Sequence, residues 1–299
     1  MLLLTGATGL VGSALLPRLL AEGAPVRCLV RDPRRLGAQR VRVQIALGDL
    51  TDPPSFRNAL RGVQTVVHLA ASIRDQPHGS IEELCGIATW RMVEAAERQG
   101  VERFVFFSAL GASSHHRARL LRAKALAEQA VSESALRSIV FAPSIVYAPG
   151  DPWLTLLERM TLLPVMPVSG RGRAAFQPIW AEDVAGCVIA ALRDEGSPPR
   201  ARYELAGPET LSHEEIIRTL LRSLGRKRPL VHVPTPVVSR ALRALEAIAG
   251  PNALATWDEA ELMETSMTSA RGAADAQALG VTPQRMAAVL PTAEPPRAG

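Results

Sequence analysis

The chain opens with the segment that decides its fold, Leu2-Leu3-Leu4-Thr5-Gly6-Ala7-Thr8-Gly9-Leu10-Val11-Gly12. A short apolar run leads into three glycines spaced three residues apart, and a helical pattern follows over residues 10–21. Between a strand and a helix, such glycines permit a tight turn, close approach of the backbone to a pyrophosphate, and close packing of helix on strand. The helix N-terminus adds N–H groups and a favourable dipole. The sequence therefore predicts dinucleotide binding at Gly6, Thr8, Gly9, Leu10 and Val11.

Short apolar runs alternate with helical patterns throughout the first half of the chain. Ranges that resemble helices separate ranges that resemble strands, which is typical of right-handed βαβ units and a parallel sheet covered on both faces. We therefore predict an α/β fold with a doubly wound parallel sheet. The expected strands are 2–4, 26–30, 41–45, 63–69, 104–108, 138–141 and 202–205, and the expected helices include 10–21, 81–99, 120–134 and 183–193.

The alternation of predicted strands and helices stops after Gly150. A short apolar helix is expected over 153–163, followed by a loop rich in proline and glycine. From Gly207 the chain reads as mostly helical, and Ser212 with Glu215 predicts a capped helix start. We assign residues 1–148, with 173–206 returning to it, to a nucleotide-binding domain. Residues 149–172 and 207–299 form a smaller, mostly helical substrate or lid region, and residues 291–299 are expected to be a loose tail.

Composition excludes several classes of protein. The 299 residues are 47% apolar and 21% charged, which is an ordinary globular balance rather than that of a disordered chain or a coiled coil. Three widely spaced cysteines argue against a disulfide framework and a CxxC metal site, and fit a reducing compartment. No apolar run reaches the roughly 18 residues of a membrane span, and no signal segment is evident. We expect a soluble, cytoplasmic protein without a metal site.

The net charge of +5 raises the question of nucleic-acid binding. The basic residues are scattered and tyrosine is nearly absent, so the sequence shows no basic stripe and no stacking platform. We therefore expect no nucleic-acid partner. The apolar stripe of Val238, Leu242 and Leu245 fits a membrane-surface or partner helix, but is more typical of a helix that faces a protein core.

The end of the second predicted strand bears on the choice of cofactor. An acidic residue there would bond the ribose 2′-hydroxyl of NAD(H), whereas an arginine accepts the 2′-phosphate of NADP(H). Arg31 and Asp32 supply both types, and Arg34 and Arg35 follow closely. Because several guanidinium groups can surround a phosphate, we favour NADP(H), with NAD(H) as the alternative. In the other interpretation, Asp32-Pro33 only starts a turn among surface arginines.

The glycine motif and a series of further motifs resemble the extended and atypical short-chain dehydrogenase/reductases. Within that superfamily the chain is most similar to the NAD(P)H-binding group that includes the nucleotide-binding accessory subunit of respiratory complex I. The likeness covers essentially the whole chain. The motifs are Leu29-Val30-Arg31-Asp32-Pro33, Gly48-Asp49-Leu50, Val67-His68-Leu69-Ala70-Ala71, Phe107-Ser108-Ala109, Lys124-Ala125-xx-Glu128, Ala142-Pro143-Ser144-Ile145-Val146-Tyr147, Gln177-Pro178-Ile179-Trp180-xx-Asp183-Val184-Ala185 and Tyr203-Glu204-Leu205-Ala206-Gly207-Pro208.

The resemblance implies a Rossmann fold and assigns further site residues. Ser108 takes the position of the catalytic serine, and Lys124 that of the lysine that bonds the nicotinamide ribose. The remaining residues are expected to line the cofactor: Asp49 and Leu50 at the adenine, Leu69, Ala70 and Ala71 after the fourth strand, and Pro143, Ser144 and Ile145 against the carboxamide.

One position departs from the pattern. Redox-active members carry a tyrosine four residues before the lysine, on the same helix face, and that position is Leu120 here. A positioned general acid contributes on the order of 10²–10⁴ in rate. Neither Tyr147 nor Tyr203 has the spacing to replace it. His115 and His116 precede the helix and carry titratable protons, but an exposed loop pair is the simpler interpretation.

Two functions remain open. The first is a binding protein that holds NADP(H) with weak or no turnover, as a structural or redox-sensing partner of another protein. The second is an NAD(P)-dependent oxidoreductase or a sugar-nucleotide epimerase-like enzyme that uses a substitute acid on the remnant site of Ser108 and Lys124. In that case Arg171 and Arg173 of the lid would hold an anionic small-molecule substrate.

Overall fold

The computed structural model describes residues 1–194, 196, 198–249 and 255–290. Its centre is a seven-stranded sheet in the order β11-β6-β5-β4-β1-β2-β3, in which every neighbouring pair is parallel. The predicted α/β fold with a doubly wound parallel sheet is confirmed. The strands are β1 (Leu2–Thr5), β2 (Val26–Val30), β3 (Gln44–Leu47), β4 (Thr65–His68), β5 (Arg103–Phe107), β6 (Arg137–Pro143) and β11 (Arg200–Leu205).

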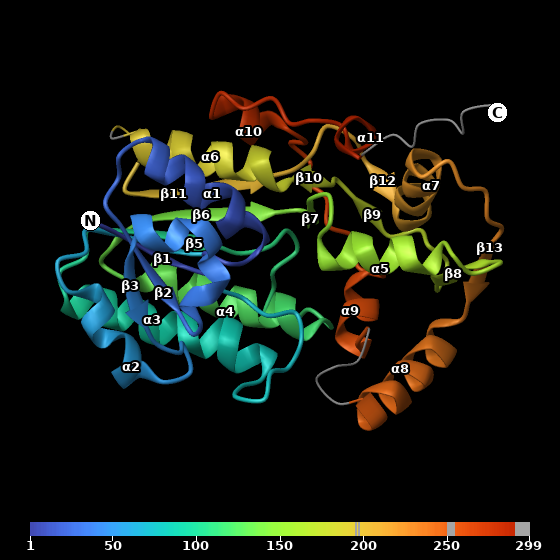
Figure 1. Ribbon diagram of the computed structural model, residues 1–299, viewed down its shortest axis with the longest axis horizontal. Coiled ribbons are helices and arrows are strands. Elements are labelled where there is room, and N and C mark those ends of the chain that lie inside the picture. The colour runs from blue at the N-terminus through green and yellow to red at the C-terminus, as the bar shows by residue number, and fades with distance from the viewer. Residues whose placement is uncertain (195, 197, 250–254, 291–299) are drawn as a thin grey trace.

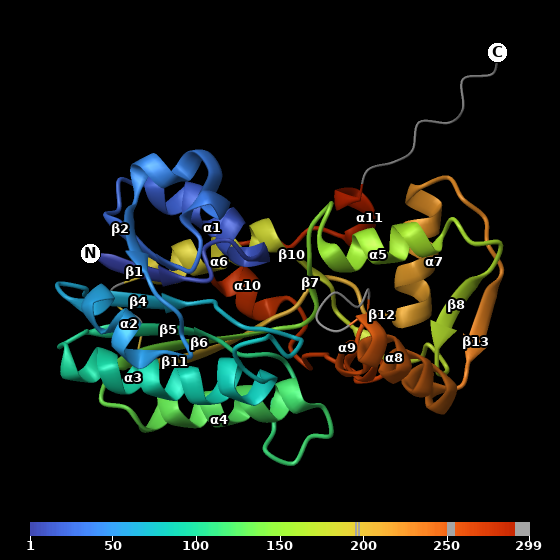
Figure 2. The same cartoon turned by 60° about the horizontal axis from the view of Figure 1, so that its bottom comes forward.

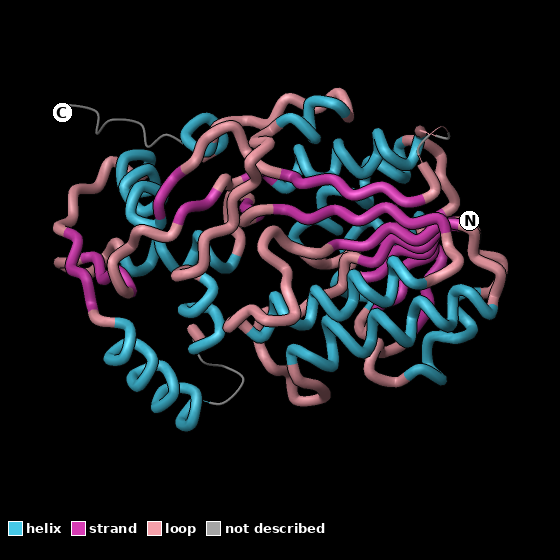
Figure 3. Tube along the Cα trace, turned by 180° about the vertical axis from the view of Figure 1, so that it is seen from behind, coloured by secondary structure: helices cyan, strands magenta, loops and turns pink. Residues whose placement is uncertain are grey.

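Helices cover both faces of this sheet (Figures 1 and 2). On one face lie α1 (Leu10–Ala21) and α6 (Ala181–Arg193), which pack on each other and on the sheet through one apolar core. On the other face lie α2 (Pro53–Arg57), α3 (Ala88–Arg98) and α4 (Arg119–Glu133), with a second core beneath them. The inner strands are therefore largely buried on both sides, as the continuous apolar runs in the sequence indicate, whereas the edge strands β3 and β11 are partly exposed. Seen from behind, the strands form one continuous layer (Figure 3).

The predicted and observed boundaries differ most at two elements. We expected a strand over 41–45, but β3 begins at Gln44 because residues Pro33–Arg42 form 3₁₀ turns, labelled η1. Pro33 occupies the first helical position and the Asp32 carboxylate accepts the Arg34 N–H, so the local chemistry starts a helix there. The helix expected over 153–163 is α5 (Pro152–Met160), which the Asp151 side chain caps. Two more short helices, η2 (Asn58–Leu60) and the π-helix η3 (Glu83–Ile87), precede α3.

The rest of the chain builds a smaller lobe beside the sheet, with a third apolar core. The predicted cap of α7 is confirmed, since Ser212 and Glu215 form a reciprocal capping box. Nowhere in the described ranges is there a helix with the length and apolarity to cross a membrane. The further elements are β7 (Val146–Tyr147), β8 (Met166–Ser169), β9 (Ala175–Phe176), β10 (Ile179–Trp180), β12 (Leu211–Ser212), α7 (His213–Ser223), β13 (Leu230–Val233), α8 (Thr235–Ala249), α9 (Trp257–Leu262), α10 (Ala274–Ala278) and α11 (Met286–Val289).

Two later predictions concern this lobe. The stripe on α8 is half-buried at Val238 and Leu242, and its third member, Leu245, has a side chain outside the described residues. The expected tail at 291–299 also lies outside them. The segment from Asp275 to Val281 returns to the sheet: the Asp275 carboxylate accepts the Glu204 N–H of β11, and Val281 lies against α6 beside Gly186. The division into two domains remains a proposal.

The glycines of the first turn set how closely α1 approaches β1. A Cβ on Gly12 would lie 2.1 Å from the Gly6 carbonyl oxygen, well inside van der Waals contact. Gly6 has a φ of 70°, and its Cβ would lie 2.7 Å from the Ala70 backbone nitrogen. A side chain at either position would therefore separate backbone segments that cannot yield cheaply.

We expect Gly12→Ala to push α1 away from the turn. Overpacking of this kind costs about 1–3 kcal/mol of unfolding free energy, and more when backbone must move. Urea denaturation measures this cost, and Ser13→Ala, an exposed position of the same helix turn, serves as the control. Equal stability of Gly12→Ala and Ser13→Ala would contradict the close packing of helix on turn.

Candidate functional site

A cavity of about 600 Å³ opens at the carboxyl ends of β1, β2 and β4. Parallel sheets bind ligands in this position, beyond the ends of the strands where the order reverses. Nine of the predicted cofactor residues line it together: Gly6, Thr8, Gly9, Arg31, Asp49, Leu50, Leu69, Ala70 and Ala71. The structure brings them together although they come from four separate stretches of the sequence.

The opening of α1 forms one wall of this cavity. Gly9 is the N-cap residue and has no side chain to cap the helix, and no acidic residue lies in the first turn. The first-turn N–H groups, including those of Leu10 and Val11, therefore lack side-chain partners from the cap. Leu10 and Val11 do not line the cavity with their side chains, so only their backbone can serve a ligand. This wall suits the two phosphates of a dinucleotide.

A second wall carries the charged residues after β2. Arg31 and Arg35 both line the cavity and are exposed, and Asp32 lies between them. Arg34 is not a lining residue and forms an ion pair with Asp32, whose carboxylate also accepts the Arg34 N–H. These hydrogen bonds lower the pKa of the Asp32 carboxyl. The acidic side chain is therefore already engaged, whereas the two arginines on either side of it form no ion pair within the part of the chain that the structure describes.

A hydrogen-bond chain fixes the end of β4 beside the cavity. The Ala70 N–H donates to Thr5 Oγ1, Thr5 Oγ1 lies 2.9 Å from His68 Nδ1, and His68 Nε2 lies 3.1 Å from Thr89 Oγ1. The Thr89 hydroxyl donates to the Cys85 carbonyl oxygen. Because donors are fixed at both ends, the network assigns the proton of the imidazole to Nε2. Burial, with a smaller effect of the Lys124 cation, lowers the pKa of His68 to about 3.

Ser108 and Lys124, the two predicted remnant catalytic residues, both lie outside the cavity lining. Ser108 is buried and its hydroxyl has no hydrogen-bond partner among the described residues. Lys124 is also buried, its Nζ donating to the Phe107 carbonyl oxygen at 2.5 Å and lying 5.0 Å from the centre of the Phe106 ring. Burial lowers the pKa of the Lys124 ammonium. The assignment of this pair to the cofactor remains a prediction.

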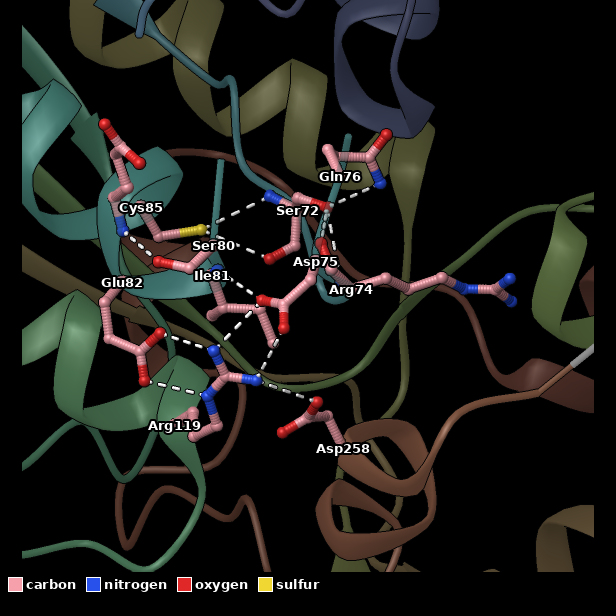
Figure 4. Close-up of polar contacts among 11 residues, drawn as sticks. Ser72, Arg74, Asp75, Gln76, Ser80, Ile81, Glu82, Cys85, Arg119 and Asp258 are labelled. Carbon is pink, nitrogen blue, oxygen red and sulfur yellow. Dashed lines mark hydrogen bonds and ion pairs between the residues drawn. The ribbon is translucent and has the colours of Figure 1, made fainter. Parts of the chain in front are cut away.

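Leu120 is half-buried and packs against the apolar core of the smaller lobe and against the small cluster of Ile81, Cys85 and Ala123. Its neighbour Arg119 is held by three carboxylates: its guanidinium reaches Glu82 at 2.7 Å, Asp75 at 3.0 Å and Asp258 at 3.3 Å (Figure 4). Hydrogen bonds from Arg119 lower the pKa of the Glu82 carboxyl to about 2. We call these four residues the Arg119 clasp. It ties the start of α4 to the loop after β4 and to α9 of the smaller lobe.

The residues after β6 serve the packing of the smaller lobe. The Ser144 hydroxyl donates to the Met267 carbonyl oxygen at 2.6 Å and accepts the Gln177 N–H, while Pro143 is buried. Ile145 packs in the core of this lobe. None of the three lines the cavity. Tyr147 is fully buried with no partner for its hydroxyl among the described residues, and burial raises the pKa of its phenol.

The sequence reading missed several lining residues. Arg35 was only one of three candidate arginines, and nothing in its spacing separates it from Arg34. Gln76 and Leu84 come from a loop and a helix start that carry no local motif, and Ser72 follows the predicted stretch by one residue. The complete additional lining is Thr5, Ala7, Leu29, Val30, Asp32, Arg35, Gly48, Ser72, Gln76 and Leu84. Within the described ranges, no three metal-ligating side chains group together.

Comparison with known proteins agrees with this geometry. A sequence model of the NAD(P)H-binding family matches residues 6–195, and the chain belongs to this family of atypical short-chain dehydrogenase/reductases. The mitochondrial NADH dehydrogenase [ubiquinone] 1 alpha subcomplex subunit 9 of Arabidopsis thaliana is 29% identical over 78% of the chain, which spans only 60% of that subunit's length. The ceramide reductase of Caulobacter vibrioides is 27% identical, and the match covers 89% of this chain and 84% of the length of that reductase.

Among solved structures, an NADPH-dependent quinone oxidoreductase from Escherichia coli complexed with NADPH superposes with a TM-score of 0.74. The match covers 97% of this chain and 98% of that one at 17% sequence identity. At this identity the likeness establishes the fold.

Two buried histidines make stability depend on pH. The folded-state pKa is about 3 for His68 and about 4 for His213, in both cases because burial disfavours the charged ring. An unfolded histidine titrates near 6.5, so the unfolded chain binds more protons below that pH and stability is lost as pH falls from 6.5 toward 3. Each histidine should lower the unfolding free energy by about 2 kcal/mol between pH 7 and pH 5.

Urea denaturation of wild type and His68→Gln at both pH values measures this effect. The variant keeps a donor and an acceptor but cannot titrate, so its loss between pH 7 and pH 5 should be about 2 kcal/mol smaller than that of the wild type. His115→Gln, in the exposed loop before α4, is the control. If the unfolding free energy of His68→Gln falls between pH 7 and pH 5 by as much as that of the control, His68 is not held neutral by burial.

Proposed function

We propose that this protein binds NADP(H) in the cavity at the opening of α1 and turns it over weakly or not at all. The observation that carries the proposal is the state of the catalytic helix. Leu120, a side chain without a titratable proton, packs where a phenol would be needed, and Lys124 directs its ammonium at the Phe107 carbonyl oxygen. This site would keep its means of holding a nucleotide, while Leu120 stands at the position of the general acid.

The preference for NADP(H) rests on the residues after β2. Asp32 is paired with Arg34 and caps η1, so its carboxylate is not free for a ribose 2′-hydroxyl. Arg31 and Arg35 line the same wall without ion pairs among the described residues. Two guanidinium groups that border one cavity suit a doubly charged 2′-phosphate better than a neutral hydroxyl.

Each part of the cavity has a role in this proposal. The first-turn N–H groups of α1 would bind the pyrophosphate, and Asp49 with Leu50 would border the adenine. The carboxylate of Asp49 accepts from both the N–H and the hydroxyl of Thr51, which fixes its orientation. Ala70 and Ala71 would line the path toward the nicotinamide, which supplies hydride chemistry when bound. A protein that keeps the nucleotide without consuming it fits a structural or redox-sensing role beside a protein partner.

A second function has specific support. The Ser108 hydroxyl is buried without a partner among the described residues, as expected of a group kept for a substrate, and the likeness to a ceramide reductase covers most of both chains. An active oxidoreductase would need another acid near this serine. His116 lies before α4 and is half-buried, but its Nδ1 already accepts the Ala118 N–H. We therefore rank turnover second.

We expect Arg31→Ala and Arg35→Ala each to weaken NADPH binding about 10- to 100-fold, because each removes a charge-assisted hydrogen bond to the 2′-phosphate. NADH affinity should change little. Fluorescence titration of both nucleotides measures the two affinities, and Arg40→Ala, an exposed arginine of η1 outside the cavity lining, is the control. Tighter NADH than NADPH binding by the wild type would contradict the role given to Arg31.

Leu120→Tyr tests the missing acid. With the phenol restored four residues before Lys124, we expect reduction of a panel of carbonyl compounds to rise above a weak wild-type rate, toward the 10²–10⁴-fold effect of a general acid. NADPH consumption at 340 nm measures the rate. Leu126→Tyr, an exposed position of the same helix, is the control.

The outcome that contradicts a binding role is efficient reduction by the wild type with no gain in Leu120→Tyr. The proton donor would then lie elsewhere, and the enzyme function would replace the binding function. NADPH affinity, measured on the same samples, shows whether a variant with low activity still binds the nucleotide.

A further inference from the structure

The basic residues of the chain are unevenly distributed. Residues 159–181 and 216–245 together hold ten of the 34 arginines and lysines and no aspartate or glutamate. The other residues carry 24 basic and 29 acidic side chains, so the excess of positive charge belongs to these two segments alone. Both segments build much of the smaller lobe, where they form the end of α5, β8, most of α7, β13 and the first part of α8.

Exposed aliphatic side chains gather in the same place. Leu162, Leu163, Val165 and Val231 are each between 40% and 65% exposed, and we call them the apolar tip. The first three form the turn between α5 and β8, and Val231 follows Leu230, which pairs with Met166 in the parallel ribbon of β8 and β13. Figures 1 and 2 show this ribbon at the end of the molecule far from the N-terminus.

Hydrogen bonds fasten the basic segment to the turn. The Arg228 Nε donates to the carbonyl oxygens of Thr161 and Leu163 at 3.0 and 2.9 Å. Arg226 donates to the Thr161 hydroxyl at 2.6 Å, and Lys227 between them is exposed with no ion pair among the described residues. These bonds hold Arg226 and Arg228 against the turn that carries the exposed leucines.

We propose that the apolar tip and the cations around it dock the protein on the surface of an anionic lipid bilayer. At such a surface, aliphatic side chains enter the boundary between headgroups and acyl chains, while arginine and lysine stay with the lipid phosphates. A nucleic acid fits less well, because the tip offers leucine and valine and no aromatic ring for stacking. The cations around the tip attract it to the bilayer, and the four aliphatic side chains hold it there. This docking is independent of whether the bound nucleotide is turned over.

Cosedimentation of the full chain with lipid vesicles tests the proposal. We expect binding to phosphatidylcholine vesicles that contain phosphatidylglycerol to be at least about tenfold tighter than to phosphatidylcholine alone, and to weaken as salt is raised. Leu162→Asp with Leu163→Asp should abolish it, and Lys227→Glu should reduce it about tenfold or more. NADPH affinity should stay unchanged in all of them, which shows that the variants are folded.

Matched controls lie on the nucleotide-binding side of the molecule. Val41→Asp and Leu126→Asp change exposed aliphatic residues there, and Arg57→Glu reverses an exposed charge. The proposal is overturned if these control variants lower vesicle binding as much as the tip variants do. It is also overturned if the wild type binds neutral and anionic vesicles equally, or binds neither. Binding of duplex DNA instead of vesicles would also overturn it, as would a dimer in sedimentation analysis that the tip variants dissociate.

Discussion

The distance between α1 and the first turn is the constraint on which the site depends. Only hydrogen fits where a Cβ of Gly12 would meet the Gly6 carbonyl oxygen, and only hydrogen fits where a Cβ of Gly6 would meet the backbone of residue 70. The same two contacts bring the helix N-terminus, the end of β1 and the end of β4 around one cavity. A larger residue at either glycine would close the phosphate site and separate the core of α1 from the sheet together.

The catalytic half of the site is organised differently. Around Leu120 the structure shows packing and ion pairs: Lys124 bonds a backbone carbonyl, and Arg119 is shared by three carboxylates. These contacts stabilise the start of α4 and its link to α9. A charged group surrounded this way is costly to free, since removal of one partner leaves the others unpaired.

The sequence predicted the sheet and the gathering of Gly6, Thr8 and Gly9 at one cavity, because both follow from local rules: glycine spacing, apolar runs and helix length. It failed at β3, where the Asp32-Pro33 pair starts a helix that outcompetes the apolar signal of Val41 and Val43. It also left Arg34 and Arg35 equivalent, although ion pairing with Asp32 turns one of them from the cavity and leaves the other on its wall. The Arg119 clasp joins residues up to 183 positions apart, so no local sequence pattern predicts it. Side-chain direction at such positions depends on tertiary contacts that single-sequence patterns do not contain.

A crystal structure of the protein grown with NADPH tests the central claim most directly. We expect the pyrophosphate within hydrogen-bond reach of the first-turn N–H groups of α1, the 2′-phosphate between Arg31 and Arg35, and no protein hydroxyl other than Ser108 near the reactive carbon of the nicotinamide. A cavity filled by protein atoms, or the Tyr147 phenol turned out of its core to face the nicotinamide, would contradict it.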